Sequence, residues 1–122
     1  MAEVILGQNF TFQVLFVNEF NAPLAVLNPK ITIFTYSSLG TKQVLVNGVA
    51  MTTVVGEVGR YTYLYTAGVG LGDHTAVYAE MEGTDPQNPA VRLLVEEQFQ
   101  TVASTTATSL IDNTLKASFV KV

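Results

Sequence analysis

The sequence predicts an all-β fold, a two-sheet antiparallel sandwich of about seven strands, and two observations carry this prediction. Apolar residues alternate with polar ones at a period of two from Asn9 to about Val102, which is typical of half-buried strands and not of helices. Signals for turns recur about every 8 to 12 residues, the spacing of a sandwich. With 122 residues, 48% of them hydrophobic, the chain is long enough for one domain with its own core.

A strong strand and a series of turns predict the first half of the domain. One face of the strand Asn9–Val17 is apolar throughout and consists of Phe10, Phe12, Val14 and Phe16. Asparagine and proline between positions 18 and 29 end this strand, and a second strand follows from Lys30 to about Tyr36. A short strand is expected over Lys42–Val46. The pair Asn47-Gly48 then predicts a hairpin turn, because both positions tolerate positive φ, with Met51–Val55 pairing back.

The second half repeats the same alternation in three further strands. Arg60–Thr66 is expected to direct its tyrosines, Tyr61, Tyr63 and Tyr65, to one face. Strands are also predicted over Asp73–Glu82 and Ala90–Val102, joined by a long polar turn at positions 83–89. Glu97 interrupts the apolar phase of the last strand, which favours a bulge or an outward twist there.

The C-terminal segment differs in composition from the rest of the chain. We therefore expect a sandwich over residues 1–102, followed over 103–122 by a Ser/Thr-rich linker and an apolar C-terminal arm. Apolar residues recur there at roughly helical spacing behind Ser109, a residue suited to cap a helix. The segment is accordingly predicted to form a short helix or an arm that docks elsewhere through Leu110, Ile111, Leu115 and Phe119.

Composition excludes several classes of protein. Charged residues make up 13% of the chain, about half of the usual fraction, and the formal net charge is -4. This balance argues against nucleic acid as a partner, because nucleic-acid binding needs clustered Lys and Arg. No apolar stretch approaches the roughly 20 residues of a membrane-spanning helix, so no membrane partner is expected. The chain has no cysteine, which excludes disulfides and thiolate metal sites.

No group of residues forms a motif that indicates a particular reaction or ligand. We therefore expect neither catalytic nor metal-ligating nor cofactor-binding residues. His74 is the only histidine, so a histidine-based catalytic set has a single candidate base. Acidic residues gather in and between the last two predicted strands: Glu80, Glu82, Asp85, Glu96 and Glu97. They could bind calcium or act as an acid/base pair, but a solvated outer face is the simpler interpretation. The chain is therefore not expected to be an enzyme.

The most informative feature is that some strands are apolar on both faces. In the strand that ends at Tyr36, Ile31 and Ile33 take one side, while Phe34 and Tyr36 take the other. Only one side can face the core, so Phe34 and Tyr36 are expected to form an interaction surface. An alternative assigns binding to the tyrosines, with Tyr65 at the end of a platform on which sugar rings would stack.

Three segments resemble the immunoglobulin-like modules of phage virion proteins and bacterial surface proteins: Phe16–Pro23, Gly59–Tyr63 and Gly72–Tyr78. The resemblance implies an immunoglobulin-like sandwich and a non-enzymatic structural protein of a phage particle, made in the host cytoplasm and located in the virion. It would act as a capsid decoration or cement protein, assembled as a homo-oligomer, for instance a trimer, on a larger virion protein such as the major capsid protein. The alternative that it implies is a carbohydrate-binding or cell-surface-binding adhesion module of a tail fibre or surface protein.

Overall fold

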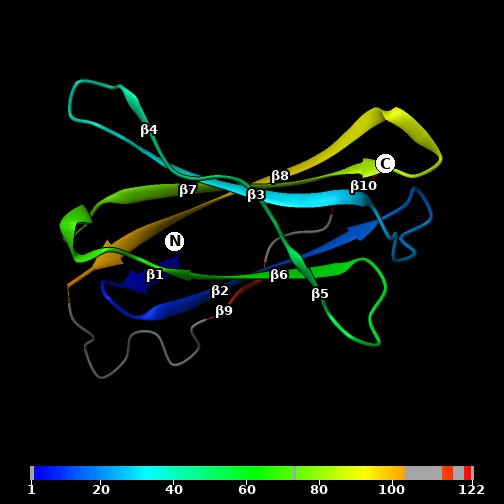
Figure 1. Ribbon diagram of the computed structural model, residues 1–122, viewed down its shortest axis with the longest axis horizontal. Helices are drawn as coiled ribbons and strands as arrows, with labels where there is room; N and C mark the ends of the chain where they lie inside the picture. Colours follow the sequence, from blue (N-terminus) through cyan, green and yellow to red (C-terminus); the bar gives the residue numbers. More distant parts are fainter. Residues whose placement is uncertain (1, 73, 104–113, 117–119, 122) are drawn as a thin grey trace.

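The chain folds as an all-β sandwich of two sheets, as predicted. The computed structural model describes residues 2–72, 74–103, 114–116 and 120–121. Figure 1 shows two layers, with β3, β7 and β8 in one and β2 and β6 in the other. No helix among these residues is long and apolar enough to cross a membrane.

The first sheet contains five strands. Of its two edge strands, one was not predicted from the sequence and the other was predicted too short. In spatial order these are β1 (Ala2–Ile5), β8 (Asn88–Val102), β7 (Ala76–Asp85), β3 (Leu27–Tyr36) and β4 (Lys42–Ala50). Neighbours are antiparallel except β1, which runs parallel to β8. β1 was not predicted from the sequence, because four residues are too few to show an alternating pattern and the partner strand is distant in the chain.

The second sheet is built on β2 (Asn9–Val17), which pairs with β6 (Arg60–Thr66), and β6 pairs with the short β5 (Thr52–Thr53). Two tail segments, β9 (Thr114–Lys116) and β10 (Val120–Lys121), run parallel to β2. The described part of the tail is thus an arm of strands. The helical alternative is wrong for these residues, because the backbone of β2 offers them hydrogen-bonding partners at its edge. A short 3-10 helix, η1 (Val69–Leu71), lies between β6 and β7.

Aromatic side chains fill the space between the sheets. The apolar face of β2 is buried as predicted, and its rings meet Phe99 of β8: the Phe12 and Phe99 centroids are 5.3 Å apart, and those of Phe10 and Phe12 are 5.1 Å apart. The opposing sheet contributes fully buried side chains at Ile31, Ile33, Val77, Ala79 and Met81. Truncating one such core phenylalanine to alanine typically costs about 3 to 5 kcal/mol, so this layer determines the stability of the domain.

The hairpin predicted at Asn47-Gly48 is wrong. β4 continues through both residues, which lie opposite Thr32 where the register with β3 shifts. Gly48 has a φ of 58°, and its N–H donates to Thr32 Oγ1 at 3.1 Å. A bulge uses the same positive φ as a turn. The chain then crosses to the other sheet, where Thr52 and Thr53 pair with β6.

The last hairpin also differs from the prediction. β7 begins at Ala76 and reaches Asp85, and β8 begins at Asn88, so the polar turn is much shorter than expected. Glu97 causes no bulge: it lies opposite Ala79 in an unbroken register. The strand therefore stays regular at Glu97, whose half-buried side chain lies on the inward side of β8.

A close backbone approach fixes the connection between β2 and β3. Gly59 has a φ of 81°, and a Cβ added there would lie 2.8 Å from Leu24 N and 2.8 Å from Phe16 O. Phe16 N donates to Gly59 O at 2.9 Å, and Leu24 N donates to Phe16 O at 2.8 Å. Two residues further along the connection, Val26 N donates to the buried Tyr61 Oη at 3.1 Å. Residues 24–26 are thereby held against β6.

We predict that Gly59→Ala destabilises the domain far more than Gly56→Ala. Both glycines have a φ of 81°, but a Cβ at Gly56 would meet nothing within 4 Å. The left-handed conformation costs about 1 to 2 kcal/mol in both variants. The collision with backbone atoms adds about 2 kcal/mol at Gly59 alone. Urea denaturation measures the difference, and equal losses in the two variants would contradict the close approach.

Candidate functional site

An aromatic cluster lies on the outer face of the first sheet. Phe34 of β3 is paired in register with Tyr78 of β7, so their side chains project from the same face. The rings of Phe34 and Tyr78 stack with centroids 5.5 Å apart, and Tyr36 meets Phe34 at 5.7 Å and Tyr78 at 5.5 Å, both edge-on. Lys42 Nζ lies 4.1 Å from the centre of the Phe34 ring. We call these four residues the outer cluster.

The outer cluster shields one ring and presents another. Phe34 is only 2% exposed although it points away from the core, because Tyr36, Tyr78 and Lys42 surround it. Tyr36 remains 49% exposed, so it is the member that a partner would contact most. The sequence correctly predicted that Phe34 and Tyr36 project from one face of β3 and Ile31 and Ile33 from the other. It missed Tyr78 and Lys42, which only the strand register brings beside them.

Strand β4 extends this surface to the edge of the sheet. Val44 lies opposite Phe34 in register and is 49% exposed. Val49 is also exposed but pairs with Ile31, so it projects from the other face, and the strand has no partner beyond β3 among the described residues. An edge strand with exposed apolar side chains is suited to pair with another chain. Its two register shifts and Lys42 restrict which chains could do so.

The tyrosines of β6 face the interior. Tyr61 is 3% exposed and Tyr65 is 8% exposed, while Tyr63 is half-buried. The ring of Tyr65 lies 6.2 Å from that of Phe12, centroid to centroid. Burial, and then the neighbouring Tyr63, raise the pKa of Tyr65 above its ordinary value of 10.0. A sugar ring therefore has little tyrosine surface on this strand to stack against.

The acidic side chains of β7 and β8 are divided between pairs and open positions. Glu82 forms ion pairs with Lys30 and Arg92 across the outer face. Glu80 and Glu96 are paired in register; Glu80 is half-buried and Glu96 is exposed. Among the described residues, no group of three or more His, Asp or Glu is arranged to hold a metal ion.

The single histidine lies in a turn and not on a strand. His74 has a φ of 59° and is exposed, and its N–H donates to Thr101 O at 2.9 Å. This hydrogen bond holds the connection between η1 and β7 against β8. Asp73, its neighbour in the chain, lies outside the described residues.

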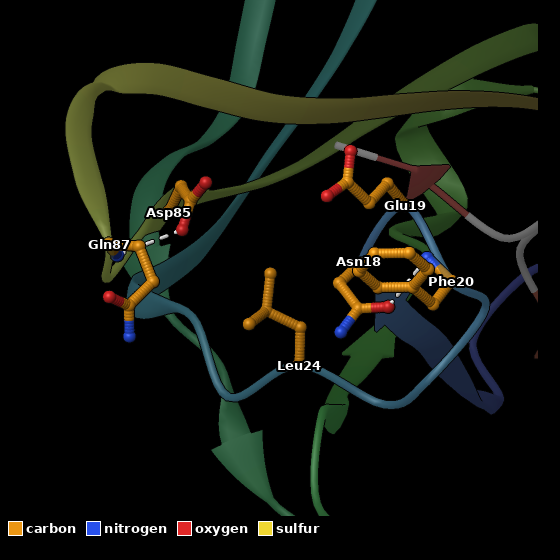
Figure 2. A pocket seen from close by; sticks show the side chains of 6 residues that line it. All are labelled: Asn18, Glu19, Phe20, Leu24, Asp85 and Gln87. Carbon is orange, nitrogen blue, oxygen red and sulfur yellow. Dashed lines mark hydrogen bonds between the residues drawn. The ribbon is translucent and has the colours of Figure 1, made fainter.

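A pocket of about 360 Å³ opens where two connections meet at one end of the sandwich. One wall comes from the connection between β2 and β3, and the other from the turn between β7 and β8. Figure 2 shows Asp85 and Gln87 on one side, Leu24 in the middle, and three residues on the opposite side: Asn18, Glu19 and Phe20. Each wall had been recognised in the sequence as a turn. Nothing in the sequence placed the two turns side by side.

The tail residues proposed for interaction are only partly described. Leu115 lies in β9, where it pairs in register with Phe12 of β2. Leu110, Ile111 and Phe119 lie outside the described residues. The candidate surfaces of the described chain are therefore the outer cluster with β4, and the pocket.

Comparison with models of protein families, with curated proteins and with solved structures finds no match in any of the three. The function is consequently argued from the geometry of this chain.

We predict that Tyr65 makes the domain sensitive to alkali. Below pH 10 the phenol is neutral in the folded and the unfolded chain, and its ionisation has no effect on stability. Above pH 10 the unfolded chain loses this proton more readily, so the free energy of unfolding falls as the pH rises. Chemical denaturation of Tyr65→Phe should show a shallower fall above pH 10 than wild type, with pH 7 as the baseline. An identical fall in both proteins would contradict the burial of the hydroxyl.

Proposed function

We propose that the chain is a non-enzymatic structural protein that assembles into a homo-oligomer and packs against a larger protein surface. The observation that carries this proposal is the outer cluster with β4: aromatic and aliphatic side chains stand half exposed on the face opposite the core. Large apolar groups on a second face are costly to leave in water, and contiguous patches of this kind mark protein interfaces.

The residue types of this surface fit a protein partner better than a small ligand. Tyrosines offer large, rigid rings with a polar end, and such rings are enriched at the centre of interfaces. Tyr36 stands half exposed beside Val44, while Lys42 over Phe34 supplies a charge at the border of the patch. An open strand edge next to the patch adds main-chain hydrogen bonds to what a second copy could offer.

The order of the strands supports the resemblance to immunoglobulin-like modules. A variable-type domain joins strands G, F, C and C′ in one sheet and B, E and D in the other. β8, β7, β3 and β4 follow the first order, and β2, β6 and β5 follow the second. We therefore retain the proposal of a phage particle component, of which a capsid decoration or cement protein is the form that best suits such a surface.

The proposal does not depend on the tail. β9 and β10 pair with β2 of the same chain, which satisfies an edge that would otherwise be open. The adhesion-module alternative has lost its expected platform, because Tyr61 and Tyr65 are buried. The outer cluster is accordingly the surface to test first.

We predict that the protein self-associates at micromolar concentration through the outer cluster. Tyr36→Ser and Val44→Ser should each raise the dissociation constant about tenfold or more, because each removes a large apolar contact from the interface. Sedimentation velocity over a concentration series measures the oligomer, and circular dichroism confirms that the variants fold.

Leu64→Ser is the matched control, because Leu64 is 60% exposed on β6 in the other sheet. It should leave the dissociation constant unchanged. A wild-type protein that stays monomeric across the series would overturn self-assembly. An oligomer that Leu64→Ser weakens as much as Tyr36→Ser would overturn the assignment of the interface.

A further inference from the structure

The pocket between the two end connections is a preformed cavity with charged and aromatic walls. Its volume of about 360 Å³ falls within the range of ligand sites, which is about 300 to 1,000 Å³. Both walls are held by local hydrogen bonds. Asn18 Oδ1 accepts from Phe20 N at 2.9 Å and from Ala22 N at 3.1 Å, and the approach at Gly59 fixes Leu24. A ligand would therefore meet walls that are already ordered.

Asp85 is the most unusual group in this pocket. It is 6% exposed, and its Oδ1 accepts the N–H of Gln87 at 2.9 Å, which stabilises the turn. The other carboxylate oxygen accepts no hydrogen bond from a described residue, and it is open to the pocket, since no buried side-chain oxygen of the described residues lacks a partner. The turn uses one oxygen, and the second is left for a donor that enters the pocket.

The remaining lining residues indicate the charge of that donor. Glu19 adds a second carboxylate on the wall opposite Asp85, and none of the described lining residues is a Lys, Arg or His. Phe20, which also lines it, is 80% exposed. An aromatic face beside carboxylates is the arrangement that attracts organic cations.

Four basic side chains are engaged elsewhere. Lys30 and Arg92 pair with Glu82, Arg60 pairs with Glu57, and Lys42 covers Phe34. None of them lines the pocket. The chain as a whole carries a formal charge of -4, so a partner with a basic surface complements it.

We propose that this pocket receives an arginine side chain of the larger partner protein. Its guanidinium would donate to Asp85 and Glu19, and its plane would stack on Phe20. A guanidinium suits these walls better than an ammonium, because it is planar and donates in two directions at once. A neutral sugar would leave both carboxylates without a counter-charge. The inference rests on the proposed function only in assigning the arginine to a protein.

The test uses N-acetyl-arginine amide as the probe and the full chain in solution. Titration followed by amide chemical shifts should move the signals of Phe20 and Gln87, and the affinity should fall as salt is added. N-acetyl-citrulline amide has the same shape without the charge and should bind about tenfold more weakly or not at all. Equal binding of both probes would overturn the role of charge. Shifts caused by methyl glucoside and not by the arginine probe would overturn the ligand class.

Asp85→Asn separates binding from the turn. The amide oxygen can still accept the N–H of Gln87, so thermal stability should be kept, while binding of the probe should weaken about tenfold. Phe20→Leu keeps an apolar group, removes the aromatic face and should weaken binding more moderately. Normal binding by both variants would overturn the site. The small probe reports on the pocket even if the protein proves monomeric, so the two proposals fail separately.

Discussion

The structure depends on removing one face of β2 from water. Phe10, Phe12 and Phe16 cannot be covered by their own sheet, so a second sheet must lie over them. Because side chains alternate along a strand, this requirement also decides which residues of β3 and β7 point inward. Once Ile33 and Ala79 face Phe12 and its neighbours, Phe34 and Tyr78 must project outward. The outer cluster is thus a consequence of the way in which the core is filled.

An outward phenylalanine that is almost fully buried needs a local explanation, and the outer cluster supplies it. Tyr36 and Tyr78 place their rings against Phe34, and Lys42 lays its charged end over the ring face. This arrangement shields Phe34 from water but leaves Tyr36 half exposed, and the ring of Tyr36 is polar only at its hydroxyl end. The tyrosine hydroxyl can be solvated by water, while contact with a partner would remove the apolar part of the ring from water.

Period-two alternation was sufficient to predict the fold class, the strand Asn9–Val17 without change, and the outward direction of Phe34 and Tyr36, because these depend only on neighbours in sequence. The errors arose where distant segments decide. Asn47-Gly48 permits a positive φ in a turn and in a bulge alike, and its pairing with β3 selected the bulge. The pocket could not be predicted for the same reason: Phe20 and Asp85 are 65 positions apart by their numbers and meet only through the sandwich topology.

The low content of charge links the two surfaces. With 13% of its residues charged, the chain has few charged groups, and four of its cationic side chains lie on the sheets in contact with Glu82, Glu57 and Phe34. At the end of the sandwich that carries the pocket, Glu19 and Asp85 have no cationic side chain beside them among the described lining residues. The proposed apolar contact on the outer face and the proposed charge attraction at this end would therefore involve different parts of the molecule. A partner could use the first for affinity and the second for orientation, since buried apolar area is not directional and a paired charge is.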